Sequence, residues 1–135
     1  MNRILVISDL HSPFYHPDTV PFLTAIKEKY DPDMVICVGD ELDHHCMSFH
    51  DTDVDMGLSA SSETEKAIGH LVPIYSLFEK VKVMHSNHGS MVFRRAKAHS
   101  IPLRFIVDYN TAINAPKGWT WHDELIITLP NKQKC

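Results

Sequence analysis

The stretch RILVISDLH, residues 3–11, joins a short apolar run to two side chains of the kinds that bind metal ions. Ile4 to Ile7 is continuously aliphatic and has polar neighbours, a pattern typical of a parallel strand buried on both faces. Asp9 and His11 come directly after it, two positions apart, so on an extended chain both side chains point to the same side. The stretch therefore predicts a strand that carries two potential ligands of one ion at its carboxyl end.

The same arrangement occurs twice more along the chain. Met34–Val38 is followed by Gly39, Asp40 and Asp43, and Val81–Met84 is followed by His85, Asn87 and His88. In an open α/β sheet, ligands bind beyond the carboxyl ends of the strands, so these side chains should converge although they are far apart in the sequence. A mixture of carboxylate, imidazole and amide donors suits Mn²⁺, Fe or Zn²⁺ better than Ca²⁺.

Helical patterns alternate with these strands and predict an α/β fold. Capping residues and prolines mark where the helices should begin and end. We expect helices over 19–30 after the N-cap Asp18, from a capping box at Ser62 and Glu65 to about residue 79 with a kink at Pro73, from Ser90 to about Ala98, and around 103–107.

The end of the chain reads as strands. Residues 119–122 and 125–129 alternate or run apolar, and Pro130-Asn131-Lys132 resembles a hairpin turn with no return strand after it. A terminal strand without a partner leaves an unpaired edge. We therefore expect either a shortened form of a longer protein or self-association, with another copy covering the C-terminal edge strand.

Composition restricts the class of protein. The chain has 135 residues, enough for a single domain over 1–135, with 44% hydrophobic and 22% charged residues. A net charge of −4 and no basic cluster longer than Arg94-Arg95 argue against unspecific nucleic-acid binding. No segment is apolar enough for a signal peptide or a membrane span, and three cysteines without CxxC spacing predict neither disulfides nor a zinc ribbon. We expect a cytoplasmic protein whose ten histidines carry the chemistry.

Three motifs resemble one known family. Ser8–His11, Val38–Asp43 and Ser86–His88 are similar to the first three motifs of calcineurin-like metallophosphoesterases, D-x-H, G-D-x-x-D and G-N-H-D/E. The resemblance extends from Arg3 to about Arg95 and agrees in order, spacing and placement after strands. It implies an α/β domain of metallophosphoesterase type, with layers of β-sheet and helix and a truncated β part at the C-terminus.

The resemblance also implies roles for the motif residues. Asp9 and His11 would hold a first metal ion, Asp40 would bridge two ions, and Asn87 would bind the second through its amide oxygen. His88 would contact the substrate phosphate and protonate the leaving oxygen. The implied reaction is hydrolysis of a phosphate mono- or diester by a hydroxide bridged between two divalent ions, with Mn²⁺ favoured and Fe, Zn or Ni as alternatives.

Other residues near the motifs have supporting roles in this hypothesis. Asp43 is the nearest carboxylate that could pair with His88, and His85 could support a ligand. Arg94 and Arg95 could clamp a substrate phosphate, although we favour an exposed helix face as their explanation. We expect solvated side chains rather than ligands at three loop histidines, and packing rather than base stacking at three aromatic residues: His44, His45, His50, Trp119, Trp121 and Phe105.

Two departures from the family pattern modify the expected function. The third motif reads S-N-H-G, without the usual acidic residue, and nothing downstream of it matches the family's later histidine and G-H-x-H motifs. A metal site lacking those ligands would be weak, incomplete or completed by another chain, and catalysis would be impaired. The alternative is a non-catalytic, shortened phosphoesterase-fold protein that binds one metal or a partner chain.

The substrate class follows only from the family. It comprises a phosphorylated small molecule, a nucleotide or a phosphoprotein, and the compact loops resemble microbial or phage members more than eukaryotic protein phosphatases. A haloacid-dehalogenase-type phosphatase needs D-x-D where this chain has Asp9 and His11. A receiver-type signalling domain needs an acidic pair and a later lysine, which are absent from the corresponding positions.

Overall fold

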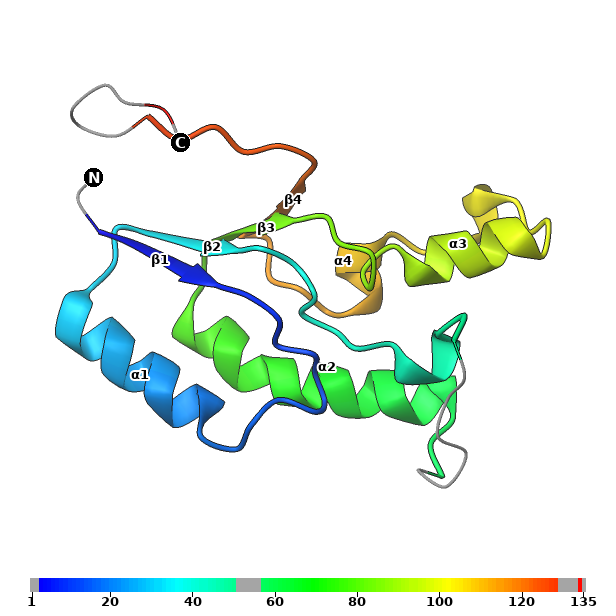
Figure 1. Cartoon of the computed structure of the whole chain (residues 1–135), viewed down its shortest axis with the longest axis horizontal. Helices are drawn as coiled ribbons and strands as arrows, with labels where there is room; N and C mark the ends of the chain where they lie inside the picture. The colour runs from blue at the N-terminus through cyan, green and yellow to red at the C-terminus, as the bar shows by residue number, and fades with distance from the viewer. Residues whose placement is uncertain (1–2, 51–56, 129–133, 135) are drawn as a thin grey trace.

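The computed structural model describes residues 3–50, 57–128 and 134. Its centre is a parallel sheet with the strand order β1-β2-β3-β4. The strands are β1 (Ile4–Ile7), β2 (Met34–Cys37), β3 (Val81–Met84) and β4 (Trp119–His122). The α/β class predicted from the sequence is confirmed, and all four strands end at the same edge of the sheet (Figure 1).

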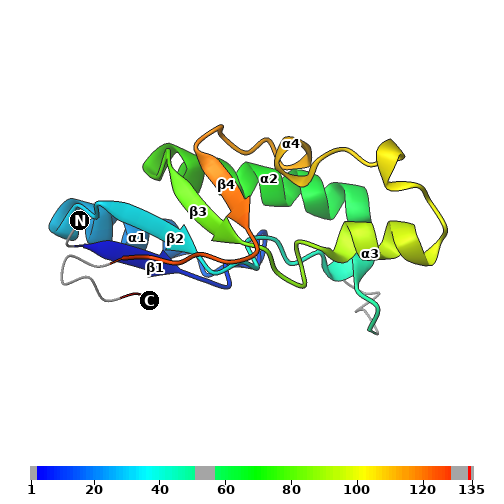
Figure 2. The ribbon, with the colours of Figure 1, turned by 90° about the horizontal axis from the view of Figure 1, so that it is seen from above.

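Helices lie along one face of the sheet and beyond its carboxyl edge. In Figures 1 and 2, α1 and α2 run beneath the strands, whereas α3 extends away from the carboxyl edge and α4 lies near β4. The helical elements are α1 (Thr19–Tyr30), η1 (His45–Met47), α2 (Ala60–Leu77), α3 (Met91–Ala98), η3 (Leu103–Phe105) and α4 (Tyr109–Ala112). No helix in the described ranges is long and apolar enough to span a membrane.

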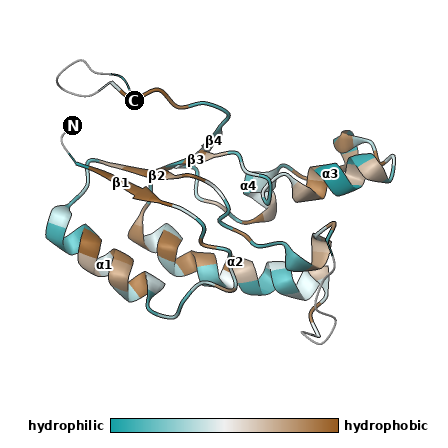
Figure 3. Cartoon of the chain, viewed as in Figure 1, coloured by the Kyte–Doolittle hydropathy of each residue, from teal (hydrophilic) through white to brown (hydrophobic). Residues whose placement is uncertain are grey.

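The core lies between the sheet and α2. Leu71, Ile74 and Val83 are fully buried there, and β1 is the most uniformly hydrophobic strand in Figure 3. Trp119 closes the β4 end, because its Nε1 donates a hydrogen bond of 2.8 Å to the backbone oxygen of Phe78. Packing of this kind stabilises the layer and holds the strand ends in register.

The expectation of burial on both faces is confirmed for β2 and wrong for β1. Val35, Ile36 and Cys37 of β2 are 7%, 7% and 0% exposed, so both faces of this strand are covered. Val6 of β1 is 56% exposed, on the side that α1 and α2 do not cover, and so is Val38, which follows β2 and is 51% exposed. Side chains alternate between the two faces of a strand, so a continuous apolar run does not by itself show that both faces are covered. The segment after β4 passes on that open side (Figures 1 and 2).

Several predicted helix boundaries need correction. The capping box of α2 is formed by Ser59 and Ser62, because the Ser59 hydroxyl accepts from the Ser62 N–H and the Ser62 hydroxyl accepts from the Ser59 N–H. The helix therefore begins before the predicted Ser62–Glu65 box, and it continues through Pro73. Asp18 occupies the N-cap position of α1 without a capping hydrogen bond from its side chain.

Two predicted elements near the C-terminus differ more. Residues 103–107 form only the short helix η3, in which Leu103 and Phe105 are exposed. Of the predicted strand 125–129, Thr128 alone among residues 125–128 forms a bridge, antiparallel to Lys134. Leu129 and the predicted turn at 130–132 lie outside the described residues.

Candidate metal centre

The turn after β1 presents Asp9 and His11 toward each other. Both residues adopt left-handed backbone conformations, with φ of 52° and 47°. Backbone hydrogen bonds to the turn after β2 hold them there: the Asp9 N–H donates to the Gly39 oxygen at 3.3 Å and the His11 N–H to the Asp40 oxygen at 2.8 Å. The Asp9 Oδ1 lies 3.7 Å from the His11 Nε2.

The turn after β2 brings Asp40 to the same place. Gly39 has a φ of 99°, and a Cβ placed on it would lie 2.6 Å from the Cβ of Ser86. Only glycine therefore allows the turn after β2 to approach the turn after β3 this closely. Asp40 is also left-handed, with a φ of 53°. Its Oδ1 is buried and has no hydrogen-bond partner among the described residues. A buried carboxylate oxygen left unpaired costs free energy unless a cation compensates it.

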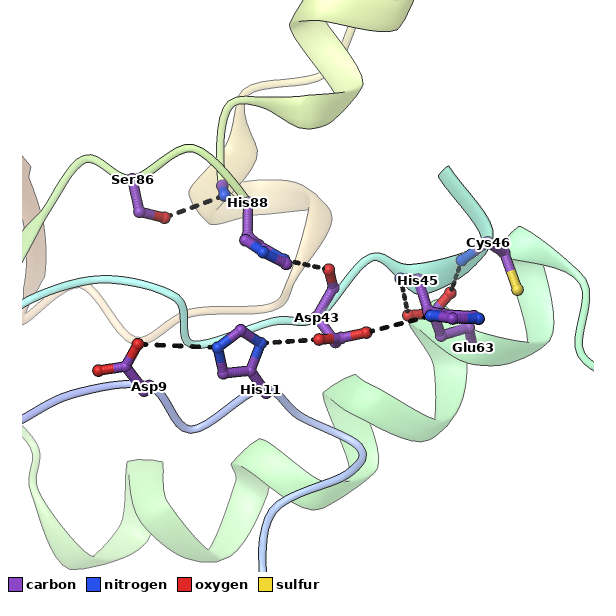
Figure 4. A network of polar contacts seen from close by, with 9 residues as sticks. Asp9, His11, Asp43, His45, Cys46, Glu63, Ser86 and His88 are labelled. Carbon is purple, nitrogen blue, oxygen red and sulfur yellow. Dashed lines mark hydrogen bonds and ion pairs between the residues drawn. The ribbon is translucent and has the colours of Figure 1, made fainter. Parts of the chain in front are cut away.

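Asp43 orients the His11 ring. Its Oδ1 lies 2.7 Å from the His11 Nδ1, and because a carboxylate can only accept, Nδ1 is the donor. The lone pair of His11 Nε2 therefore faces Asp9, as in the carboxylate–histidine pairs that orient metal ligands. Figure 4 shows Asp9, His11 and Asp43 in one row.

His88 joins this cluster through the backbone of Asp43. Its Nδ1 makes a short contact with the Asp43 carbonyl oxygen, so Nδ1 carries the proton and Nε2 is the nitrogen left for a substrate (Figure 4). The His88 and His11 rings meet edge to face, with centroids 4.8 Å apart. The expected pairing of the Asp43 carboxylate with His88 is therefore wrong, because that carboxylate binds His11 and only the carbonyl of Asp43 reaches His88.

Two sets of donors are close enough to hold an ion. Their ligand atoms lie within 4.8 Å of one another, and the sets are Asp9, His11 and Asp40, and His11, Asp43 and His88. We favour the first set because His11 Nδ1 already donates to Asp43, whereas its Nε2 can coordinate. The second set then supports and orients the first.

Asn87 lies beside this cluster on the turn after β3. The Ser86 hydroxyl accepts from the Gly89 N–H at 3.0 Å, and the Ser90 hydroxyl donates to the Asn87 backbone oxygen at 3.0 Å. Gly89 occupies the position at which the motif of the resembled family has an acid. The hydrogen bond from its N–H to the Ser86 hydroxyl supports this turn. Asn87 is exposed, and its predicted role as a ligand stays a prediction.

The arginines after the third motif bind the loop that follows Asp43. The Arg95 Nε donates to the Met47 oxygen at 2.8 Å, and its Nη2 makes a short contact with the Ser48 oxygen. Both guanidinium groups lie over the Phe49 ring, that of Arg95 at 4.1 Å and that of Arg94 at 5.1 Å. These contacts hold α3 against the loop. They give Arg94 and Arg95 a structural role that does not require binding of a substrate phosphate.

His85 and the loop histidines belong to neither of the two donor sets. His85 is exposed, with its Nε2 4.0 Å from the Asp123 Oδ1. His50 is exposed as expected, but His44 is only 4% exposed, and burial lowers the pKa of its imidazole. The expectation of a solvated side chain is therefore wrong for His44, which packs near the ring of Tyr109.

Two buried acids were not identified from the sequence. Glu63 accepts hydrogen bonds from the His45 and Cys46 N–H groups at 2.6 and 2.8 Å and so fixes the loop after Asp43 (Figure 4). An acid at the position of α2 that continues the apolar face of Leu71 is the signal that could have identified it.

The second buried acid, Glu41, is only 1% exposed. Its Oε1 accepts a hydrogen bond of 3.2 Å from the Trp121 Nε1. Burial raises the pKa of its carboxyl, and hydrogen bonding, including the bond from Trp121, partly offsets this effect. Glu41 thus ties β4 to the turn that carries Asp40, and its position directly after Asp40 gave no sequence signal of this contact.

Comparisons with known proteins agree with this geometry. A family model described as calcineurin-like phosphoesterase matches residues 2–126, which includes all three motifs and continues through β4. No curated protein and no solved structure gives a significant match to the chain.

Proposed function

The chain belongs to the calcineurin-like phosphoesterase family. We propose that it hydrolyses a phosphate mono- or diester with the help of divalent metal ions. The observation that carries this proposal is the buried Asp40 Oδ1, which lacks a hydrogen-bond partner and belongs to a donor set with Asp9 and His11. An acceptor oriented in this way without a donor fits a cation.

The residues present fit a metal ion of intermediate hardness. Two carboxylates and one imidazole converge from two strand ends. Asn87 on the third turn would add an amide oxygen. This mixture favours Mn²⁺, with iron, zinc and nickel as alternatives. Divalent ions, when bound, neutralise the charge of the phosphate oxygens and make a water molecule more acidic.

His88 is the residue we assign to proton transfer. Its Nδ1–H is held by the Asp43 carbonyl, so the ring keeps one orientation with Nε2 available to the leaving oxygen. The same turn places the ring edge to face with His11. When Nε2 is protonated as well, the imidazolium can donate a hydrogen bond from Nε2 to the phosphate and then give that proton to the departing alcohol, which leaves a neutral ring with its proton on Nδ1.

Hydrolysis of p-nitrophenyl phosphate and bis(p-nitrophenyl) phosphate tests the proposal. We expect Mn²⁺-dependent release of nitrophenol from at least one of them, lost on chelation. His88→Ala should retain Mn²⁺ and lose about 100-fold or more in kcat, the usual contribution of a positioned acid. His99→Ala, at the exposed C-terminal end of α3, is the matched control and should behave as wild type.

Two results would contradict the proposal. One is a wild-type rate no higher than that of Mn²⁺ in buffer. The other is a His88→Ala variant that turns over as fast as wild type. Retained Mn²⁺ binding without turnover in the wild-type chain would instead favour a non-catalytic metal-binding protein.

A further inference from the structure

A groove lined by aromatic side chains lies beside the turns after β2 and β3, which carry Asp40 and His88. It consists of two cavities of about 490 and 130 Å³ that share His85, Phe93, Tyr109 and Trp121 as lining residues. The larger cavity falls within the volume range of small-molecule sites, roughly 300–1,000 Å³, and the smaller one falls below it. Because the two cavities share walls from α3, α4 and β4, we treat them as one groove.

The smaller cavity reaches the turns that carry the metal-binding residues. It is lined by Ser86, Gly89 and Ser90, which surround Asn87 and His88 in the chain, and by Glu41, the neighbour of Asp40. A molecule whose phosphate lies at the metal centre therefore has this groove as a place for the group attached to the phosphate.

The walls are preorganised for a flat ring. The Tyr109 and Trp121 rings meet nearly perpendicularly, with centroids 5.8 Å apart. The Trp121 indole is fixed by its hydrogen bond of 3.2 Å to Glu41, and Phe93 adds a third aromatic wall from α3. Aromatic side chains held in place bind planar rings by stacking and lose little conformational entropy in doing so.

The rim of the larger cavity is polar. Asp108, Asn110 and Lys117 supply a carboxylate, an amide and an ammonium group there. Lys117 is the one lysine or arginine among the described residues that line the groove, so the groove lacks the basic track that a nucleic-acid strand requires. A single ring with polar substituents fits better than a polymer.

We propose that this groove binds the planar aromatic group of the phosphoester, a nucleobase or an aryl ring, while the phosphate lies at the metal centre. This inference rests on the proposed hydrolysis and names its substrate class. It also revises the sequence-based expectation for Trp121, which contributes to a binding surface as well as to packing. Trp119 also lines the larger cavity, but it is 2% exposed and keeps its packing role.

Steady-state kinetics with matched esters test this substrate class. We expect a lower KM for adenosine 5′-monophosphate or phenyl phosphate than for glycerol phosphate in the presence of Mn²⁺. Phe93→Leu should raise the KM of the aromatic esters about tenfold and leave that of glycerol phosphate within about twofold. Phe105→Leu, at an exposed position outside the groove, is the matched control. An equal change for all three esters would overturn the proposal and leave the phosphoesterase function standing.

Binding without phosphate or metal separates the groove from the reaction. Adenosine and phenol should quench the tryptophan fluorescence of the wild-type chain, whereas ribose should not. Phe93→Leu and Trp121→Phe should each weaken this binding, and folding of both variants is checked by circular dichroism. Tighter binding of adenosine assigns the groove to a nucleobase, and tighter binding of phenol assigns it to an aryl ring.

The two failures remain distinguishable. Aromatic binding in a chain that hydrolyses none of the esters would support the groove and contradict the proposed function. If neither adenosine nor phenol binds up to millimolar concentration, the proposal that the groove binds an aromatic group is wrong, whichever esters the chain hydrolyses.

Discussion

Leu71, Ile74 and Val83 are 0% exposed between the sheet and α2. By contrast, Asp9 is exposed and Asp40 is half-buried, and both adopt left-handed backbone conformations a few residues beyond the strand ends. In the layer between the sheet and α2, the apolar side chains are closely packed and shielded from water. The second region keeps backbone strain and an unpaired carboxylate oxygen that packing does not compensate. The packed layer therefore supplies the stability that allows the turns to remain strained and ready for a ligand.

Truncating the packed layer should have the largest effect on stability. Leu71→Ala removes fully buried methyl groups and should lower the free energy of unfolding by about 2–5 kcal/mol, measured by urea denaturation without metal. The Mn²⁺ affinity of the folded fraction should not change. Val72→Ala, 52% exposed on the same helix, is the control and should cost less than about 1 kcal/mol. A Leu71→Ala variant as stable as this control would contradict the division between the regions.

A change at Gly39 should affect both regions. A Cβ there would lie 2.6 Å from the Ser86 Cβ at a φ of 99°, so Gly39→Ala should lose about 1–3 kcal/mol of stability and weaken Mn²⁺ binding. Gly69→Ala is the matched control, because a Cβ in that helical position meets nothing within 4 Å. It should gain about 0.5–1 kcal/mol. Unchanged Mn²⁺ affinity in Gly39→Ala would show that the approach of the two turns is not needed for the site.

The smallest effect is a pH dependence that belongs to the packed layer. Burial raises the pKa of the Tyr75 phenol above its usual value of 10.0. The contribution of the protonated phenol to the free energy of unfolding is therefore complete below pH 10 and is lost as the pH rises further. Between pH 9 and 11 the wild type should lose about 1.4 kcal/mol more stability than Tyr75→Phe. Tyr30→Phe, which is exposed, should keep the wild-type dependence. Parallel curves for wild type and Tyr75→Phe would disprove the assignment.

The sequence was sufficient for the first three strands and for the convergence of the motifs. Short, mostly apolar runs followed by polar ligand-type residues are local signals, and parallel strands place their carboxyl ends together whatever the details of packing. For the same reason the proximity of Asp9, His11 and Asp40 followed from the strand ends alone.

The pairing of polar groups could not be predicted in the same way. Asp43 has two histidines within reach, and only the tertiary positions of the turns decide that its carboxylate binds His11 and its carbonyl His88. Burial of Glu41 and Glu63 likewise depends on Trp121 and on the loop after Asp43, which are distant in sequence. The helix predicted around 103–107 is limited to η3, where Leu103 and Phe105 are exposed, and an apolar pattern alone does not specify which residues are buried.

Mn²⁺ titration of the wild-type chain and of Asp40→Asn by calorimetry tests the metal centre most directly. We predict that the wild type binds Mn²⁺ and that Asp40→Asn weakens the affinity at least about 100-fold, because it removes one charged ligand. The metal-free stability of this variant should stay within about 1 kcal/mol of wild type, because the Asp40 Oδ1 has no hydrogen bond to lose. Equal Mn²⁺ affinity in the two chains, or no binding to the wild type, would contradict a metal centre at Asp40.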